Sequence, residues 1–260
     1  FRDSKPILTR PAIKAALTSP DIPFNDGAMR PIIVEAPKGS MLNPRHPAPV
    51  RARMEACSRA WNAVMKALAQ AVPEKVIAPG YDTTTAFCLS ALQEHGWSVY
   101  LEVYGGGFGA TTESDGCDGV DNPLSNCSNT PVEAMDQDFS FFRVTEYGLR
   151  PNSAGVGRHR GGAGFYRRFE VLEDGTKLAL YSDRFKRQAE GLFGGGPGAT
   201  GYCEVHRGGQ RMALKSKDTI ELRKGDIVTL ALGGGGGYGD PSQRSEAARA
   251  RDIEDGLVSA

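Results

Sequence analysis

The sequence predicts an α+β protein, because helical patterning dominates its first half and strand patterning its second. In residues 49–72, apolar side chains recur at intervals of three and four between charged ones, as in an amphipathic helix. Residues 97–104, WSVYLEVY, indicate a strand, and after Phe139 short apolar runs are separated by turn dipeptides. We expect an amphipathic helix and a mixed sheet in an α/β part, residues 1–138. An antiparallel, β-rich part, residues 139–260, follows.

Local punctuation predicts the elements of the first part. A short helix is expected at residues 12–18, and a proline-rich loop at 37–49 leads into the long helix, which Pro73 ends. Residues 81–92 fit either a helix or a strand. Residues 105–131 contain Gly, Asp, Asn, Ser or Pro at most positions, and a loop of this length is usually functional or part of an interface.

Turn dipeptides organise the second part. Asp174-Gly175, Gly208-Gly209 and Lys224-Gly225 each separate two strand-like runs, so we expect three hairpins. The charged segment RSEAARARDIEDGLVSA at the end of the chain predicts a surface helix that ends near Gly256.

Composition and charge argue against several classes of protein. Lys and Arg number 31, as do Asp and Glu, so no net charge attracts nucleic acid or a membrane surface. No apolar run reaches the roughly 20 residues that a membrane helix needs. The cysteines form no C-x-x-C pair, which favours reduced thiols in a cytoplasmic protein, with a Cys117–Cys127 disulfide as the alternative. The first residues, FRDSKPILTRP, lack an initiator methionine and an apolar leader, so a fragment or a processed chain is expected.

The glycine stretch YGGGFGATTESDG, residues 104–116, has the spacing of a dinucleotide-binding turn at Gly105, Gly107 and Ala110. Such a turn must open a helix whose N-terminus binds the pyrophosphate, but glycines, a proline and carboxylates follow here. The sequence therefore disfavours a nucleotide site. A second stretch, GGGGGYGDP at 233–241, fits either tight backbone packing or the wall of a substrate channel.

Six separated segments together resemble the hydantoinase B/5-oxoprolinase family. They are RPIIVEAPKGSMLNPRHPAPV, YGGGFGATTESDG, LSNCSNTPVEA, YGLRPNSAGVGRHRGGAGFYRRFEV, GLFGGGPGAT and GGGGGYGDPSQR. The family includes ATP-dependent hydrolases of cyclic amides and subunits of ketone carboxylases. The resemblance implies that a kinase-like A-type partner uses ATP and Mg²⁺ to phosphorylate the substrate, and that the B-type component performs the next step.

The resemblance covers only the C-terminal half of a B-type polypeptide. It implies a preceding N-terminal half, which would hold a divalent metal, and we assign no metal ligand to this chain. His46, His95, His159 and His206 are scattered without ligand spacing, in keeping with this assignment.

Candidate catalytic residues lie in and around the loop at 105–133. Attack of water on a phosphorylated amide carbon needs a general base and donors to the developing oxyanion. Glu102, Asp115 or Glu133 could supply the base. The donors could come from the backbone of Gly105, Gly106 and Gly107, with the Asn126 or Asn129 side chain.

Arg158 and Arg160 could bind the carboxylate or phosphate of the substrate. Alternatively, the Asp and Asn residues of the loop bond their own backbone, and the two arginines belong to an ordinary salt-bridged loop.

These observations predict part of the B-type subunit of an ATP-dependent cyclic amide hydrolase, itself inactive without its partners. One alternative is a subunit of an ATP-dependent ketone carboxylase. Another is a non-catalytic half that forms interfaces within such a complex.

Overall fold

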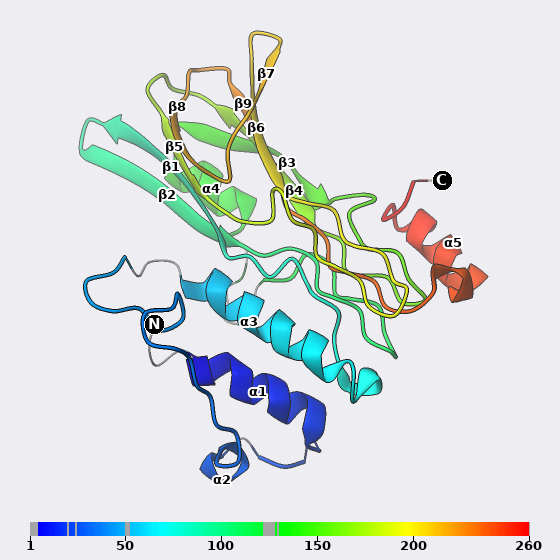
Figure 1. Ribbon diagram of the computed structural model, residues 1–260. Helices are drawn as coiled ribbons and strands as arrows, with labels where there is room; N and C mark the ends of the chain where they lie inside the picture. Colours follow the sequence, from blue (N-terminus) through cyan, green and yellow to red (C-terminus); the bar gives the residue numbers. More distant parts are fainter. Residues whose placement is uncertain are drawn as a thin grey trace.

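The computed structural model describes residues 5–19, 21–23, 25–49, 53–121, 128 and 130–259. Its strands form two antiparallel sheets, one in the order β2-β1-β5-β8 and one in the order β3-β4-β9-β6-β7 (Figure 1). The strands are β1 (Thr85–Gln93), β2 (Gly96–Tyr104), β3 (Phe142–Leu149), β4 (Phe165–Val171), β5 (Lys177–Tyr181), β6 (Tyr202–Arg207), β7 (Gln210–Ala213), β8 (Lys217–Glu221) and β9 (Ile227–Ala231).

Helices lie mostly in the first half, so the α+β class is confirmed. They are α1 (Lys5–Leu17), α2 (Asp26–Met29), α3 (Arg53–Leu68), α4 (Val132–Asp138) and α5 (Glu246–Glu254), with short 3₁₀ turns at Pro73–Lys75 and Pro241–Gln243. The mixed sheet expected in the first half is instead antiparallel, and β1 shares it with β5 and β8 of the second half. Figure 1 shows α1 beside α3 below the sheets.

Several elements expected from local sequence patterns have different bounds in the structure. The long helix is α3, which begins later and ends earlier than predicted, and the short helix at 12–18 is the second half of α1. The ambiguous segment 81–92 ends in β1, a strand that buries alternate residues. The predicted C-terminal helix is α5, capped by the Ser245 side chain, with Gly256 in a left-handed conformation just beyond it.

The main core lies between the two sheets. Inward residues of β1 and β4 alternate with partly exposed ones, as expected for strands buried on one face. The rings of Phe87 and Phe169, one from each sheet, stack with centroids 4.7 Å apart. This packing holds the two sheets face to face.

Of the three expected hairpins, only the one at Gly208-Gly209 is confirmed; it joins β6 to β7. The other two predictions are wrong, because Asp174-Gly175 and Lys224-Gly225 each carry the chain from one sheet to the other. These crossings lie side by side: Lys224 N donates to Asp174 Oδ1 (3.0 Å), and Gly225 N donates to the carbonyl oxygen of Val171 (2.8 Å). Since both sheets face one core, the apolar alternation continues across a crossing as it would across a hairpin.

Between the sheets and α3 lies a region of irregular backbone that we call the glycine bundle. It is formed by residues 76–81, 105–110, 115–121, 153–164, 189–201 and 233–239. Backbone hydrogen bonds join these segments, for example from Gly107 N to Gly233 O (3.0 Å), from Gly235 N to Gly162 O (2.9 Å) and from Gly236 N to Pro79 O (2.8 Å). The segment at 233–239 contacts most of the other segments and forms the centre of the bundle.

In the central segment, 233–239, glycines three residues apart face the same neighbouring segment. A Cβ added at Gly234 or Gly237 would meet the segment at 153–156, whereas one added at Gly233 or Gly236 would meet the segment at 190–199. Each would lie closer than 3.0 Å to a carbonyl oxygen, a separation that real Cβ atoms essentially never show. Three residues per turn is the repeat of an extended polyproline-type backbone, which leaves its own hydrogen-bonding groups free for neighbours. Of the two alternatives for residues 233–241, the geometry supports tight packing.

Candidate functional site

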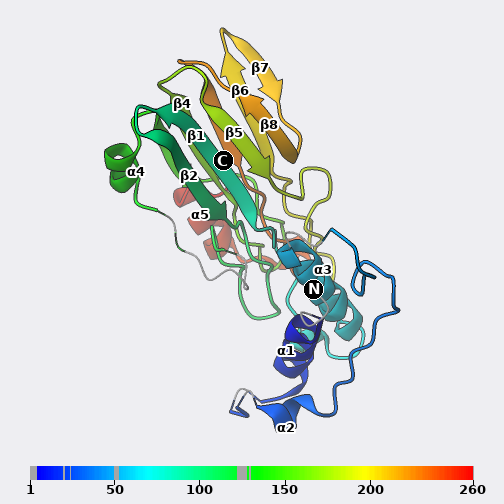
Figure 2. The same ribbon diagram turned by 90° about the vertical axis from the view of Figure 1, so that its left-hand side faces the viewer.

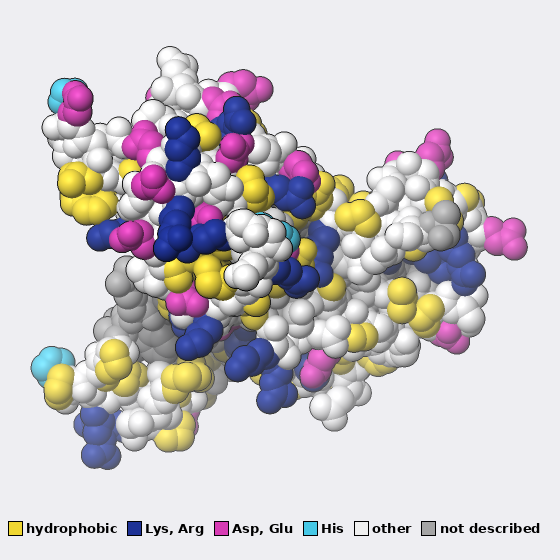
Figure 3. Space-filling view, turned by 90° about the horizontal axis from the view of Figure 1, so that it is seen from above, with side chains coloured by type: hydrophobic (Ala, Val, Ile, Leu, Met, Phe, Trp, Pro, Cys, Tyr) yellow, Lys and Arg dark blue, Asp and Glu magenta, His cyan; other side chains and the backbone are white. Residues whose placement is uncertain are grey.

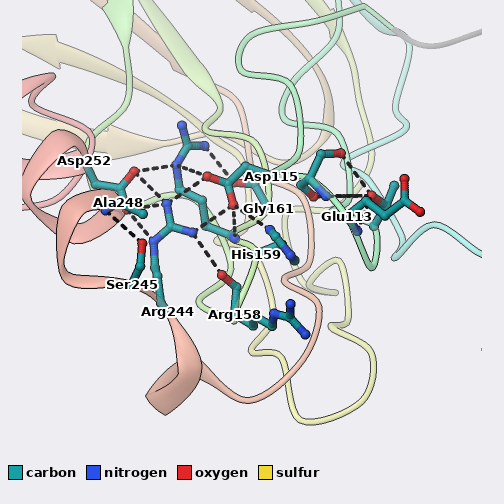
Figure 4. Close-up of polar contacts among 12 residues, drawn as sticks. Glu113, Asp115, Arg158, His159, Gly161, Arg244, Ser245, Ala248 and Asp252 are labelled. Carbon is teal, nitrogen blue, oxygen red and sulfur yellow. Dashed lines mark hydrogen bonds and ion pairs between the residues drawn. The ribbon is translucent and has the colours of Figure 1, made fainter. Parts of the chain in front are cut away.

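A cluster of charged side chains connects the long loop to α5. It comprises Asp115, Asp118, Arg160, Arg244 and Asp252, and we call it the aspartate–arginine cluster. Figure 4 shows Asp115, Arg244 and Asp252 directed toward one another. Glycines set its geometry, because Gly116 N donates to Arg160 O (2.8 Å) and Gly162 N to Phe108 O (2.7 Å). These bonds bring the loop at 115–118 beside residues 158–163.

Within the cluster, each arginine side chain donates hydrogen bonds to two carboxylates. Arg160 forms a fork on Asp118, with distances of 2.7 and 3.0 Å, and donates from Nε to Asp252 (3.0 Å). Arg244 forms a fork on Asp115, with both distances 2.8 Å, and donates from Nε to Asp252 Oδ2 (2.8 Å). Asp252, on α5, therefore bridges both guanidinium groups.

The cluster keeps the carboxylate of Asp115 ionised. Burial alone would raise the pKa of Asp115, but hydrogen bonds and charge from Arg244, with further contributions from Arg160, lower this pKa below its ordinary value. An ionised carboxylate held by two arginines is a weak proton acceptor. The geometry therefore suits Asp115 to positioning the loop more than to general-base catalysis.

A second network holds the other end of the loop. Glu102, on β2, is buried and accepts from Arg167 Nη1 (2.7 Å), Tyr104 (3.0 Å) and Tyr100. Its other oxygen accepts from the backbone N of Thr130 at 2.9 Å. The carboxylate thus links the sandwich core to the chain just after residue 129.

The sequence-predicted site residues occupy several separate places. Asp115 and Arg160 lie in the aspartate–arginine cluster, Glu102 lies in the core network, and Glu133 is exposed in the first turn of α4. Arg158 is exposed, and Figure 4 shows its guanidinium directed away from the cluster.

Gly105, Gly106 and Gly107 are buried in the glycine bundle, where the amides of Gly106 and Gly107 already donate to carbonyl oxygens. Asn126 and Asn129 lie outside the described residues, as does Cys127, the second cysteine of the alternative disulfide. Among the described cysteines, Cys57, Cys88, Cys117 and Cys203, no disulfide is formed.

Three participants were missed by sequence reasoning: Arg167, Arg244 and Asp252. Arg167 left a signal, because it occupies an inward position of β4 between Phe165 and Phe169. A charged residue in an inward apolar series indicates a buried ion pair. Arg244 and Asp252 left none, since only the tertiary fold brings them to Asp115.

A polar region with strained backbone lies where α3 approaches the residues just before β1. Asp82 and Arg184 both have left-handed backbone angles, with φ of 46° and 55°, which cost non-glycine residues free energy. Arg59 donates to the carbonyl oxygen of Asp82 (3.0 Å), and Arg184 donates to that of Tyr81 (2.7 Å). Burial lowers the pKa of Arg184 to about 10, and the nearby Arg59 adds to the effect.

Beside the aspartate–arginine cluster is a cavity of about 450 Å³ between residues 154–157 and α5. Its walls include Arg160, Arg244 and Arg249 together with Val156, Ile253 and Val258. Arg160 and Arg244 are already paired, whereas Arg249 is exposed and donates to the carbonyl oxygen of Pro241 (2.9 Å). Such a lining suits a small molecule with an apolar body and an anionic group.

Two kinds of ligand site that glycine motifs and carboxylates suggest, a metal centre and a phosphate cradle at residues 105–110, can be tested against the described residues. Among them, no group of three or more His, Cys, Asp or Glu side chains could hold a metal ion. The loop at 105–110 offers no phosphate cradle, because the space beside Gly107 is filled by the backbone of Gly162 and Gly235. No helix of the described chain is long and apolar enough to cross a bilayer. On the face seen in Figure 3, basic and acidic side chains are interspersed.

Comparison with known proteins gives consistent matches. A family model described as hydantoinase B/oxoprolinase matches residues 8–241. An uncharacterized protein of Methanocaldococcus jannaschii is 36% identical over 249 residues, which are 95% of this chain and 43% of that protein. The B-type subunit of a putative D-/L-hydantoinase from a Pseudomonas species is 32% identical over 241 residues, 92% of this chain and 40% of that protein.

Solved structures share the fold. The ATP-dependent caprolactamase from Pseudomonas jessenii matches with a TM-score of 0.82 and 22% identity, over 96% of this chain and 45% of that chain. Nucleotide-free acetone carboxylase matches with a TM-score of 0.66 and 21% identity, over 79% of this chain and 33% of that chain. At these identities the likeness concerns the fold alone. The chain spans less than half the length of each of these proteins.

Proposed function

This chain belongs to the hydantoinase B/oxoprolinase family, and from that membership we propose that it forms part of the B-type subunit of an ATP-dependent cyclic amide hydrolase. In this proposal an A-type partner phosphorylates the substrate, and the B-type subunit directs water to the activated amide carbon. Relatives named as a hydantoinase B-type subunit, 5-oxoprolinases and a caprolactamase beta subunit support the reaction class. The chain acts within a complex, together with the B-type region that it does not cover.

One observation supports assigning ATP to the A-type partner and not to this chain. The glycine motifs that resemble a nucleotide turn are filled by neighbouring backbone, so this chain supplies no phosphate cradle of its own at residues 105–110. Activation by ATP is therefore assigned to the A-type partner. A divalent metal is assigned to the B-type region outside this chain, as the family resemblance implies.

For the chain's own residues, we propose two kinds of role. Glu102 and Asp115 are positioning residues on either side of the segment at 122–129. Asp115 holds the chain before it, by accepting from Arg160 N (2.9 Å), and Glu102 holds the chain after it, by accepting from Thr130 N. Direct roles fall to Glu133 as general base and to Asn126 and Asn129 as donors to the substrate. Arg158, which is exposed, provides a cation for the substrate's anionic group.

Two other functions have specific support. A ketone carboxylase subunit is the second candidate, because the family that this chain belongs to resembles such subunits as well as amide hydrolases, and acetone carboxylase shares the fold. A purely structural half is favoured by the saturated pairing of Arg160, whose nitrogens donate to Asp118, Asp252 and the carbonyl oxygen of Gly161.

The test uses the assembled complex with its A-type partner. Turnover of 5-oxoproline, hydantoin and caprolactam is measured with ATP, and ketone consumption is measured with and without bicarbonate. We expect ATP-dependent ring opening that does not require bicarbonate. Bicarbonate-dependent consumption of a ketone would instead identify the carboxylase.

Variants then separate the catalytic from the structural alternative. Glu133→Gln is expected to lower turnover at least 100-fold, the usual contribution of a general base, whereas Asp136→Asn on the same helix is expected to leave it unchanged. Phosphorylation of the substrate by the A-type partner should persist in both. If Glu133→Gln, Asn126→Ala and Asn129→Ala all retain full turnover, the catalytic assignment of this segment is wrong.

A further inference from the structure

The outward face of the β1–β2 hairpin carries an apolar stripe. Its members are Leu92, Trp97, Val99 and Leu101, with exposed fractions of 67%, 55%, 53% and 62%. The alternation of β2 explains their direction, because Tyr100, Glu102 and Tyr104 are buried on the other side. Leu92 lies directly opposite Trp97 in the strand register, so the four side chains are contiguous.

This stripe lies on an edge strand. The order β2-β1-β5-β8 gives β2 one described neighbour, so its far edge presents backbone donors and acceptors. In Figure 2 no helix or strand lies in front of the hairpin. An apolar edge strand of nine residues, left uncovered, would favour aggregation.

Other sheet edges lack this character. At the far edge of the same sheet, β8 exposes Lys217, Thr219 and Glu221. On the second sheet, β7 is only four residues long, and β3 has a register irregularity between Val144 and Glu146. Charged side chains, short strands and bulges are the devices that protect edges, and β2 has none of them along its stripe.

We propose that this face binds the part of a B-type polypeptide that the present chain does not cover, either on the same polypeptide or on a separate chain. The inference rests on the proposed function in so far as it assumes a B-type assembly. In the solved caprolactamase the matching fold makes up 45% of its chain, so it occurs together with more than its own length of further polypeptide. That additional length is the occupant that the relatives provide.

The stripe also lies next to the proposed catalytic segment. β2 runs from the stripe directly into Glu102, which binds Thr130 N, and into the glycine loop. A polypeptide seated on β2 would therefore reach the loop that carries the proposed catalytic groups. Recognition would combine main-chain pairing along the free edge with apolar contact to Trp97, whose ring already lies 4.9 Å from Lys177 Nζ.

Binding tests the proposal without relying on turnover. The probe is the B-type region absent from this chain, taken from the same genome and expressed as a separate tagged chain. Its dissociation constant is measured against the unmodified chain, Val99→Lys, Leu101→Lys, and the control Met212→Lys, which places the same charge at an exposed apolar position of β7. Thermal unfolding of each variant establishes that it is folded.

We expect Val99→Lys and Leu101→Lys to weaken binding at least 10-fold and Met212→Lys to change it less than 2-fold. In a Trp61→Phe background, the Trp97 emission should shift to shorter wavelength on binding. Equal affinities for all variants would overturn the proposal, as would a self-association that Leu101→Lys abolishes and the probe does not displace. A complex that binds in this way but shows no amide hydrolysis would contradict the proposed function and leave this inference intact.

Discussion

Asp115 illustrates how the surroundings of a single residue decide its role. The sequence places it in a glycine loop, where a carboxylate suggests a base. The fold surrounds it with Arg244, Arg160 and the ring of His159, whose Nδ1 lies 3.7 Å from Oδ1. Its pKa is lowered below the ordinary value, with burial opposing and Arg244 producing the shift.

This shift predicts how stability depends on pH. A carboxyl whose folded pKa lies below its unfolded pKa stabilises the native state above the unfolded value, and the stabilisation is lost as the pH falls through the folded pKa. Asp115→Asn should therefore lower the free energy of unfolding by about 1.5 kcal/mol at pH 7, and the difference should persist to about pH 4 and shrink as the pH falls further.

The measurement is urea unfolding of the two proteins at several pH values between 7 and 3. Glu113→Gln, an exposed change two residues away, is the control and should stay close to the unmodified chain throughout. A difference between Asp115→Asn and the unmodified chain that grows as the pH falls would contradict the assignment.

At the scale of elements, the close backbone packing of the glycine bundle leaves no space for an added side chain. A Cβ at Gly235 would lie within 3.0 Å of the carbonyl oxygen of Phe108, and both partners are backbone atoms that cannot rotate away. Gly148, on β3, has an ordinary φ and only the Tyr166 ring nearby, at 3.7 Å.

Gly235→Ala should therefore lower the free energy of unfolding by about 3 kcal/mol or more, whereas Gly148→Ala should change it by less than about 1 kcal/mol. Thermal and denaturant unfolding of the two variants measures the difference. Comparable effects at the two positions would mean that the bundle is looser than its hydrogen bonds indicate.

Elements also mark the limit of prediction from sequence. The helix α3 and the strand β2 were predictable, because the period of their apolar residues reports which face is buried. Partners were not, since Asp174-Gly175 and Lys224-Gly225 have the chemistry of hairpin turns yet join different sheets. Alternation specifies which face of a strand is buried and carries no information about which strand lies beside it.

The candidate site shows the same limit. Asp115 and Arg160 were predicted from a glycine frame, but their partners Arg244 and Asp252 are supplied by the C-terminal segment and α5. The buried pair of Glu102 and Arg167 joins strands of different sheets. Such pairings depend on tertiary packing, which leaves little trace in local spacing.

For the whole molecule, the glycine bundle predicts slow hydrogen exchange outside regular secondary structure. Amides of Gly107, Gly162, Gly235 and Gly236 donate to carbonyl oxygens of other segments and are buried. They should exchange on the time scale of the β1 and β4 amides, far more slowly than those of the exposed turn at Gly208. Exchange followed by mass spectrometry or NMR tests this expectation, and rapid exchange across 233–239 would refute it.

The same architecture determines when this protein can fold. The central segment of the bundle, residues 233–239, forms backbone hydrogen bonds with Pro79, Gly107 and Gly155, and so with segments from distant parts of the chain. Before residues 233–239 are in place, those segments lack their shared hydrogen-bonding partner. Closing the long loops between them slows folding. During synthesis, the bundle can assemble only after residues 233–239 have left the ribosome. A truncation just before residue 233 should therefore leave the preceding glycine segments unassembled, whatever the stability of the sheets.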